Sequence, residues 1–216
     1  FYKTKQNLWA LIGVAGTLFG MLASFLSGSR GGWVLLPVAL VYLILANKKF
    51  SIKQLSLVAV ACILLTSAVL SNHAIREHLR INEAINNISQ YTNDDNKNTS
   101  VGIRFELWKN AATIITQHPV LGISKSQRIE EREQQIQLGT LTLDETTKVY
   151  HAHNEYLEAL SLRGLFGLIA LIGMLVLPLT IFIKNKDRSN LALTAVNQAG
   201  IASSIMFIGY GLTQVF

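Results

Sequence analysis

Apolar residues gather in five runs along the chain, separated by polar segments of very different lengths. The runs cover residues 8–26, 32–46, 55–70, 165–183 and 191–215. A helix needs about 20 apolar residues to cross about 30 Å of hydrocarbon, so each run is a candidate membrane span, the second and third being short. The composition agrees, since 50% of residues are hydrophobic and only 15% are charged, against about 25% in typical soluble domains. The pattern predicts an all-α, polytopic membrane helix bundle with about five transmembrane helices.

The polar residues between the runs predict which side of the membrane each segment faces. Basic residues cluster before the first run, between the second and third, and between the fourth and fifth: Lys3, Lys5, Lys48, Lys49, Lys53, Lys184, Lys186 and Arg188. An even number of spans separates any two clusters, so all three share one side, which the positive-inside rule makes the cytoplasm. The turn at 27–32 and the long segment 71–154 then face the other side, and residues 155–216 supply an interfacial helix and two spans.

The net charge of +6 therefore reflects topology and attraction to anionic lipids, and does not indicate nucleic-acid binding. The chain begins at Phe1 and stops inside an apolar run, which is typical of an internal or C-terminal piece of a larger protein.

The long segment holds all five histidines and ten of the thirteen acidic residues. Within it, residues 93–100 are polar and aperiodic, which predicts a loop. Ser100 is then expected to cap a helix that Pro119 ends, with an apolar stripe at helical spacing formed by Ile103, Leu107, Ala111, Ile114 and Ile115. Arg104 lies in the first turn, where a cation opposes the helix dipole. It is either a solvated side chain or part of an anion site.

A second polar helix is predicted over 124–139, with Ser124 or Ser126 as its cap and Gly139 at its end. Arg128 and Arg132 fall four residues apart on one face. That face is either a solvated charged surface, the default expectation, or a basic edge for phosphorylated lipid headgroups. Trp108 is expected to be an interfacial anchor or a packing residue, or alternatively a platform for a sugar.

The turn SGSRGG at 27–32 places Arg30 between two spans, where a tight turn needs only small residues. It lacks the Lys-Ser/Thr ending of a phosphate-binding P-loop. Arg30 either extends to a lipid headgroup or belongs to a site.

His151 and His153 immediately precede the fourth apolar run. Residues at i and i+2 do not face each other on a helix, which argues against a shared metal even with Glu155 and His118 nearby. His153 is either a structural imidazole or a general base suited to neutral pH. Asn154 is placed to orient the ring or a substrate hydroxyl.

These stretches resemble the O-antigen ligase family of lipopolysaccharide assembly, a branch of the O-antigen polymerase and ligase superfamily. The family signature is His, then Asn, Ser or Gln, nine residues, Gly, two residues and Gly. His153, Asn154, Gly164 and Gly167 stand at that spacing. SGSRGGWVLLP resembles the turn that carries one essential arginine, here Arg30, and NTSVGIRFELW resembles the stretch that carries the second, here Arg104. The resemblance covers most of 27–173. Gly31 and Gly32 depart from the bulkier residues of other members.

The resemblance implies transfer of a glycan from undecaprenyl diphosphate to lipid A-core at the periplasmic face of the bacterial inner membrane, without a cofactor or metal. His153 would be the base, and Arg30 and Arg104 would hold the diphosphate. Further substrate-binding residues would be Asn154, Arg128, Arg132, Trp108, Gly164 and Gly167. Family members have about a dozen helices, so amino-terminal ones are expected outside this chain.

Three alternatives stay open at this point. An O-antigen polymerase or a protein O-oligosaccharyltransferase of the same superfamily would use the same donor and similar residues with another acceptor. A transporter or flippase component would need ionisable groups inside the bundle, and no span has one near its middle. Convergence of Arg30, Arg104 and His153 on one site would separate an enzyme from a scaffold.

Overall fold

The computed structural model describes residues 35–46, 81–93, 96–143, 151–185 and 190–215, with a few separate residues between positions 12 and 77. All regular structure in this part of the chain is helical, as the sequence predicts. The helices, in chain order, are α2 (Leu36–Ala46), α5 (Ile81–Asn93), α6 (Ser100–Gln117), α7 (Lys125–Gln137), α8 (Glu155–Lys184) and α9 (Leu191–Tyr210).

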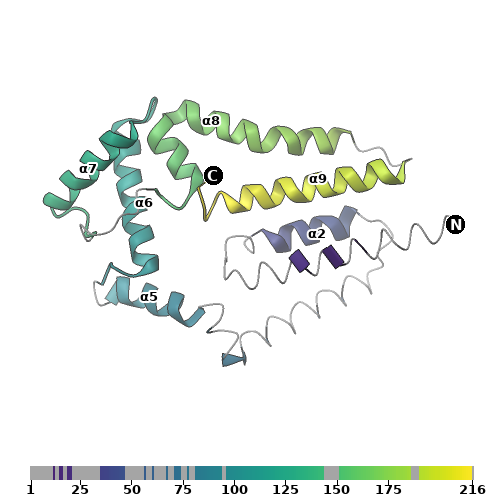
Figure 1. Cartoon of the computed structure of the whole chain (residues 1–216), viewed down its shortest axis with the longest axis horizontal. Helices are drawn as coiled ribbons and strands as arrows, with labels where there is room; N and C mark the ends of the chain where they lie inside the picture. The colour runs from purple at the N-terminus through teal and green to yellow at the C-terminus, as the bar shows by residue number, and fades with distance from the viewer. Residues whose placement is uncertain are drawn as a thin grey trace.

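Helices α2, α8 and α9 lie side by side (Figure 1), with α9 packed against both of the others. Of the described helices, α8 and α9 are long and apolar enough to cross a membrane, whereas α2 is a shorter apolar helix. The apolar runs 8–26 and 55–70 lie almost entirely outside the described residues. A bundle of about five spans is therefore not confirmed. Large apolar side chains such as Phe166, Leu177 and Val196 are exposed on α8 and α9, as expected for helices that face lipid.

Helices α5, α6 and α7 form a separate group at one end of the apolar helices (Figure 1), with α6 packed against α5, α7 and α8. The predicted apolar stripe of α6 is confirmed, because Leu107, Ala111 and Ile114 are fully buried. Leu107 packs with Leu141 and Leu143, which follow α7. That the group lies on the extracytoplasmic side stays a prediction.

The helix ends agree with the sequence at most positions. Helix α7 begins after Ser124, whose side chain accepts from the Gln127 N–H while Gln127 bonds back to the Ser124 N–H. This is the capping box that a Ser-x-x-Gln spacing allows. Helix α6 ends before Pro119, as expected. Its cap is Thr99, not Ser100, because Thr99 has extended backbone and its hydroxyl accepts from the Gly102 N–H at 3.0 Å.

Helix α8 breaks at Gly164, where the backbone adopts φ 61°, ψ −161°. The segment 119–123 crosses the helix at this break, and its backbone forms hydrogen bonds with the backbone groups that the break leaves without partners in the helix. The Leu165 N–H donates to the Pro119 carbonyl at 2.9 Å, and the Ile123 N–H donates to the Ser161 carbonyl at 3.1 Å. The short first leg of α8 turns across the end of α9 (Figure 1), where the Glu155 N–H donates to the Gly211 carbonyl at 2.7 Å.

We expect Gly164→Ala to destabilise the fold. Only glycine readily adopts this backbone conformation, for which another residue costs about 1–3 kcal/mol. In addition, a Cβ at this position would lie 2.1 Å from the Val120 carbonyl oxygen. Thermal unfolding in detergent measures the effect. Gly173→Ala on the same helix is the matched control, since a Cβ there meets nothing within 4 Å. Equal unfolding temperatures for the two variants would contradict the close contact between segment 119–123 and the backbone of α8 at Gly164.

Candidate functional site

The segment His151–Asn154 enters helix α8 at the point where α6, α7 and α9 meet it. Asn154 is the cap of α8: its side-chain oxygen accepts from the N–H groups of Tyr156 and Leu157 at 3.0 and 3.1 Å. Its amide nitrogen lies 3.4 Å from the Leu212 carbonyl. The Asn154 oxygen is therefore used by the helix, and the predicted contact to a substrate hydroxyl stays a prediction.

Ala152, between the two histidines, is fully buried and is held on both sides. Its N–H donates to Oε2 of Glu158 at 2.8 Å. Its carbonyl accepts from the indole N–H of Trp108 at 2.6 Å. Trp108 also packs edge-on against Phe105, with ring centroids 5.6 Å apart. The packing role expected for Trp108 is confirmed, and a sugar contact stays a prediction.

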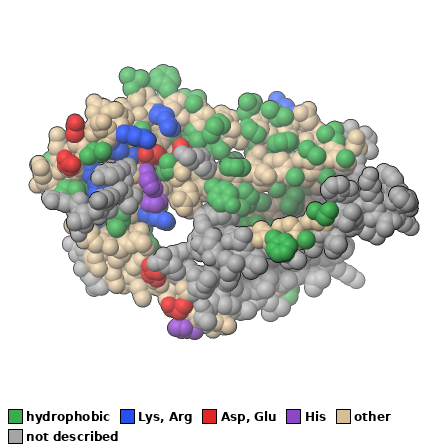
Figure 2. Space-filling model, viewed as in Figure 1, with side chains coloured by type: hydrophobic (Ala, Val, Ile, Leu, Met, Phe, Trp, Pro, Cys, Tyr) green, Lys and Arg blue, Asp and Glu red, His purple; other side chains and the backbone are tan. Residues whose placement is uncertain are grey.

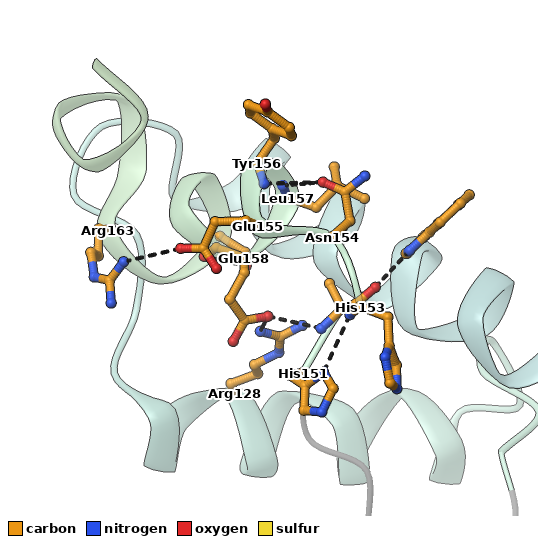
Figure 3. A network of polar contacts seen from close by, with 12 residues as sticks. Arg128, His151, His153, Asn154, Glu155, Tyr156, Leu157, Glu158 and Arg163 are labelled. Atoms are coloured by element: carbon orange, nitrogen blue, oxygen red, sulfur yellow. Dashed lines mark hydrogen bonds and ion pairs between the residues drawn. The ribbon is translucent and has the colours of Figure 1, made fainter. Parts of the chain in front are cut away.

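His153 follows with φ 48°, the only positive φ of a non-glycine residue in the described part of the chain. Its ring lies edge-on to His151, with centroids 4.1 Å apart. Its backbone N–H donates to Nδ1 of His151 at 3.4 Å (Figure 3). Nδ1 of His153 is buried without a hydrogen-bond partner among the described residues. A strained residue with an unsatisfied ring nitrogen is a feature typical of functional sites.

The surroundings keep the His153 imidazole neutral. Burial, then His151, then Arg104 lower the pKa of His153 from 6.5 to about 4, and Glu158 acts in the opposite direction. Burial disfavours the charged imidazolium, and nearby cations repel it. His153 is therefore unprotonated at neutral pH, which is the state that a general base requires.

Arg104 lies near enough to His153 to lower the pKa of its imidazole, although the two residues stand 49 positions apart in the sequence. Arg104 lies in the first turn of α6 and is partly buried. Arg30 lies outside the described residues, so the expected convergence of Arg30, Arg104 and His153 on one site stays a prediction.

Comparison with known proteins identifies the family. The O-antigen ligase family matches residues 15–172, which include Arg30, Arg104 and the whole motif from His153 to Gly167. The chain belongs to the O-antigen ligase family. This confirms the resemblance drawn from the motifs.

Two curated relatives of this O-antigen ligase family member are similar along most of the chain. An uncharacterized protein of Haemophilus influenzae is 33% identical over 218 residues, covering 100% of this chain and 54% of its own length. An O-antigen ligase of Escherichia coli K12 is 28% identical over 197 residues, covering 88% of this chain and 43% of its own length. The chain thus spans about half the length of the curated relatives it matches.

The default expectation of a solvated face at Arg128 and Arg132 is wrong. Both side chains are buried, 4% and 5% exposed, together with Gln135 on the same face of α7. Nη1 of Arg128 pairs with Oε2 of Glu158 at 2.7 Å (Figure 3), and Gln135 accepts from Asn110 of α6 at 3.2 Å. The polar face of α7 is thus the face that packs against the rest of the protein. A contact of Arg128 or Arg132 with lipid headgroups stays a prediction, and these two side chains expose little surface for it.

The two glycines of the motif have packing roles. Gly164 allows the backbone crossing described above, and a Cβ on Gly167 would lie 2.2 Å from the Arg163 Cβ. Their expected contact with substrate stays a prediction. On the face seen in Figure 2, lysine, arginine and histidine side chains gather on the side of the molecule that holds α5, α6 and α7, beside the apolar surface of α8 and α9.

Glu158 is the residue of the site that the sequence analysis missed. It is 6% exposed and binds both Arg128 and Ala152. One signal was present, namely a carboxylate five residues after His153 in the first turn of a predicted helix. Carboxylates are common there because they complement the helix dipole, so spacing alone does not reveal a buried pair. Among the described residues, no group of three His, Cys, Asp or Glu could hold a metal.

We expect the His153 imidazole to titrate near pH 4, well below 6.5. NMR of histidine-labelled protein in detergent measures the midpoint, and a His153→Asn variant assigns the signal. Arg104→Met removes a repelling cation and should raise the midpoint. Because the unfolded chain binds more protons between pH 6.5 and about 4, His153 destabilises the fold as the pH falls through this window. A midpoint at 6.5 that Arg104→Met leaves unchanged would contradict this geometry.

Proposed function

We propose that the chain carries the catalytic centre of an O-antigen ligase, which transfers a glycan from undecaprenyl diphosphate to a sugar hydroxyl of lipid A-core. The observation that carries the proposal is the half-buried His153 imidazole, whose pKa is lowered by burial, His151 and Arg104, at the junction of α8 with the group formed by α5, α6 and α7. Membership of the family supports an enzyme acting on lipid-linked polysaccharide. The particular donor and acceptor, and the activity of the whole protein, are part of the proposal.

The reaction is a direct displacement at the anomeric carbon. His153 accepts the proton of the acceptor hydroxyl while its oxygen forms a bond to the anomeric carbon. The bond from that carbon to the diphosphate oxygen breaks, and the electron pair leaves with undecaprenyl diphosphate. The configuration at the anomeric carbon inverts. Base catalysis of this kind contributes about 10²- to 10⁴-fold to a rate.

Arg104, with Arg30, binds and neutralises the diphosphate. A guanidinium is always charged and pairs with phosphate oxygens through two hydrogen bonds. Arg104 also lies at the start of α6, where backbone N–H groups favour an anion. Fixed cations at a partly buried site stabilise the charge that develops on the leaving group, which is the role a divalent metal has in other transferases.

The diphosphate also changes the base. Arg104 lowers the pKa of His153 in the free protein. A bound dianion next to both residues offsets the positive charge and raises that pKa towards neutrality. His153 is then a stronger base when the donor is in place, which suits a proton transfer at neutral pH.

The location of the site follows from the same proposal. Both substrates are lipids, so their reacting groups meet at the membrane surface where α8 begins. We place this surface on the periplasmic side of the inner membrane, opposite the lysine clusters of the predicted cytoplasmic loops. The composition of α8 and α9 favours transfer chemistry over transport. Transport usually needs ionisable side chains inside the bundle. The described parts of these helices carry none between Arg163 and Lys184 or between Leu191 and Tyr210.

Transfer by the purified full-length protein tests the proposal, with lipid-linked glycan as donor and lipid A-core as acceptor. We expect His153→Ala to lower kcat by about 10²- to 10⁴-fold, and Arg104→Ala to weaken donor use as well. His118→Ala is the matched control, because His118 is an exposed histidine outside the site, and it should leave the rate unchanged.

The same assay separates the superfamily alternatives. Transfer to a second O-antigen unit or to a protein, with no transfer to lipid A-core, would show that lipid A-core is not the acceptor and would favour the polymerase or the protein O-oligosaccharyltransferase. Full activity of His153→Ala at normal protein levels would remove the base from the mechanism.

A further inference from the structure

A carboxylate that does not touch the His153 ring nevertheless bears on its position. Glu158 lies in the first leg of α8 and is 6% exposed. One of its oxygens, Oε2, accepts from two donors: Nη1 of Arg128 at 2.7 Å and the backbone N–H of Ala152 at 2.8 Å. In Figure 3 the side chains of Glu158 and Arg128 meet beside the segment that carries His151 and His153.

We propose that Glu158 and Trp108 are positioning residues that hold the backbone of Ala152 from both sides and so fix the orientation of the His153 imidazole. The inference deepens the proposed function, because it rests on His153 as the base. It assigns Glu158 no contact with substrate. Arg128 belongs to the same device, since it holds the carboxylate in place.

The two bonds fix both peptide groups next to Ala152. The bond from its N–H to Glu158 sets the peptide that joins it to His151. The bond from its carbonyl to Nε1 of Trp108, at 2.6 Å, sets the peptide that joins it to His153. Three helices therefore position one buried alanine: α6 through Trp108, α7 through Arg128 and α8 through Glu158.

His153 needs such restraint because its φ of 48° is unfavourable for any residue with a Cβ. A strained conformation persists only where the surrounding structure holds it. Its ring does not supply the restraint, since Nδ1 has no hydrogen-bond partner among the described residues. If the peptide before it were free to rotate, His153 would relax to negative φ and its imidazole would move away from Arg104.

The bonding pattern also distinguishes this arrangement from a carboxylate that orients an imidazole directly. Both hydrogen bonds that the structure shows for the Glu158 carboxylate go to Arg128 and to the Ala152 backbone. Its charge is balanced by the guanidinium of Arg128, which is itself 4% exposed. The carboxylate thus acts on the base through the backbone.

Two double variants of the full-length protein test the inference in the transfer assay. Arg128→Met with Glu158→Gln removes both charges but keeps an oxygen that can accept from Ala152. Arg128→Met with Glu158→Met removes both charges and that acceptor, at similar side-chain length. Neither leaves an unpaired buried charge, so the two differ chiefly in the bond to Ala152.

We expect the Gln variant, which loses Arg128 but keeps an acceptor for the Ala152 N–H, to have a clearly higher kcat than the Met variant. The Met variant should lose about 100-fold in kcat, the effect of moving a catalytic group by about 1 Å, with an unchanged KM for the lipid-linked donor. Equal kcat in the two variants, high or low, would overturn the inference. A purely structural role would lower the amount of folded protein without separating kcat from KM.

Trp108→Phe provides a second measurement should the Met variant fail to fold. It removes the bond on the other side of Ala152 and leaves the Arg128 and Glu158 pair intact. We expect a lower kcat with unchanged donor KM and thermal stability near that of the wild type, and an unchanged kcat would overturn the inference. His153→Ala in the same assay separates the two proposals. If that variant is fully active, the proposed function fails. If it is inactive while the Met variant and Trp108→Phe are active, only the positioning role fails.

Discussion

The break in helix α8 at Gly164 is the constraint on which the rest of the described structure depends. A helix that leaves the membrane and bends loses backbone hydrogen bonds, and hydrocarbon offers no replacement for them. Here residues 119–123 supply partners, through Leu165 to Pro119 and Ile123 to Ser161. The two backbones touch so closely that neither Gly122 nor Gly164 has room for a Cβ. The segment 119–123 that provides hydrogen-bond partners at the bend also connects α6 to α7, so the same contact attaches both helices to α8.

The histidine segment takes its place from this junction. Because the first leg of α8 turns across the end of α9, Asn154 can cap α8 while its neighbour Glu155 bonds to Gly211. Glu158, one turn further along, then faces Arg128 of α7. A buried ion pair is weak evidence for stability, since apolar residues of similar size often serve as well, although removing one partner alone costs about 3–5 kcal/mol. The pair is better understood by what its carboxylate also binds, which is the backbone between the two histidines.

Much of this arrangement could be read from the sequence, and the failures have physical causes. The stripe of α6, its end before Pro119 and the cap of α7 at Ser124 depend on local spacing, and all three are confirmed. The polar helix α5 was not predicted. The burial of Arg128 was missed because charged residues at helical spacing normally face water. Only the tertiary structure shows that Glu158, 30 residues away, supplies a partner. Arg104 and His153 are paired by resemblance to a family, and whether they meet depends on the packing of α6 against α8, which no local pattern encodes.

The charges around His153 are consistent with a site that is incomplete without its donor. In the free protein, burial, His151 and Arg104 all lower the pKa of His153, the proposed base. An isolated imidazole with so low a pKa is a poor proton acceptor. A diphosphate bound by Arg104 would reverse the local charge and so strengthen the base as the leaving group arrives. By reciprocity, a proton on His153 would strengthen donor binding to the same degree. On the proposed function, His153 would be a stronger base when the leaving group is present, and the Arg104 guanidinium would couple proton transfer to the departure of the diphosphate.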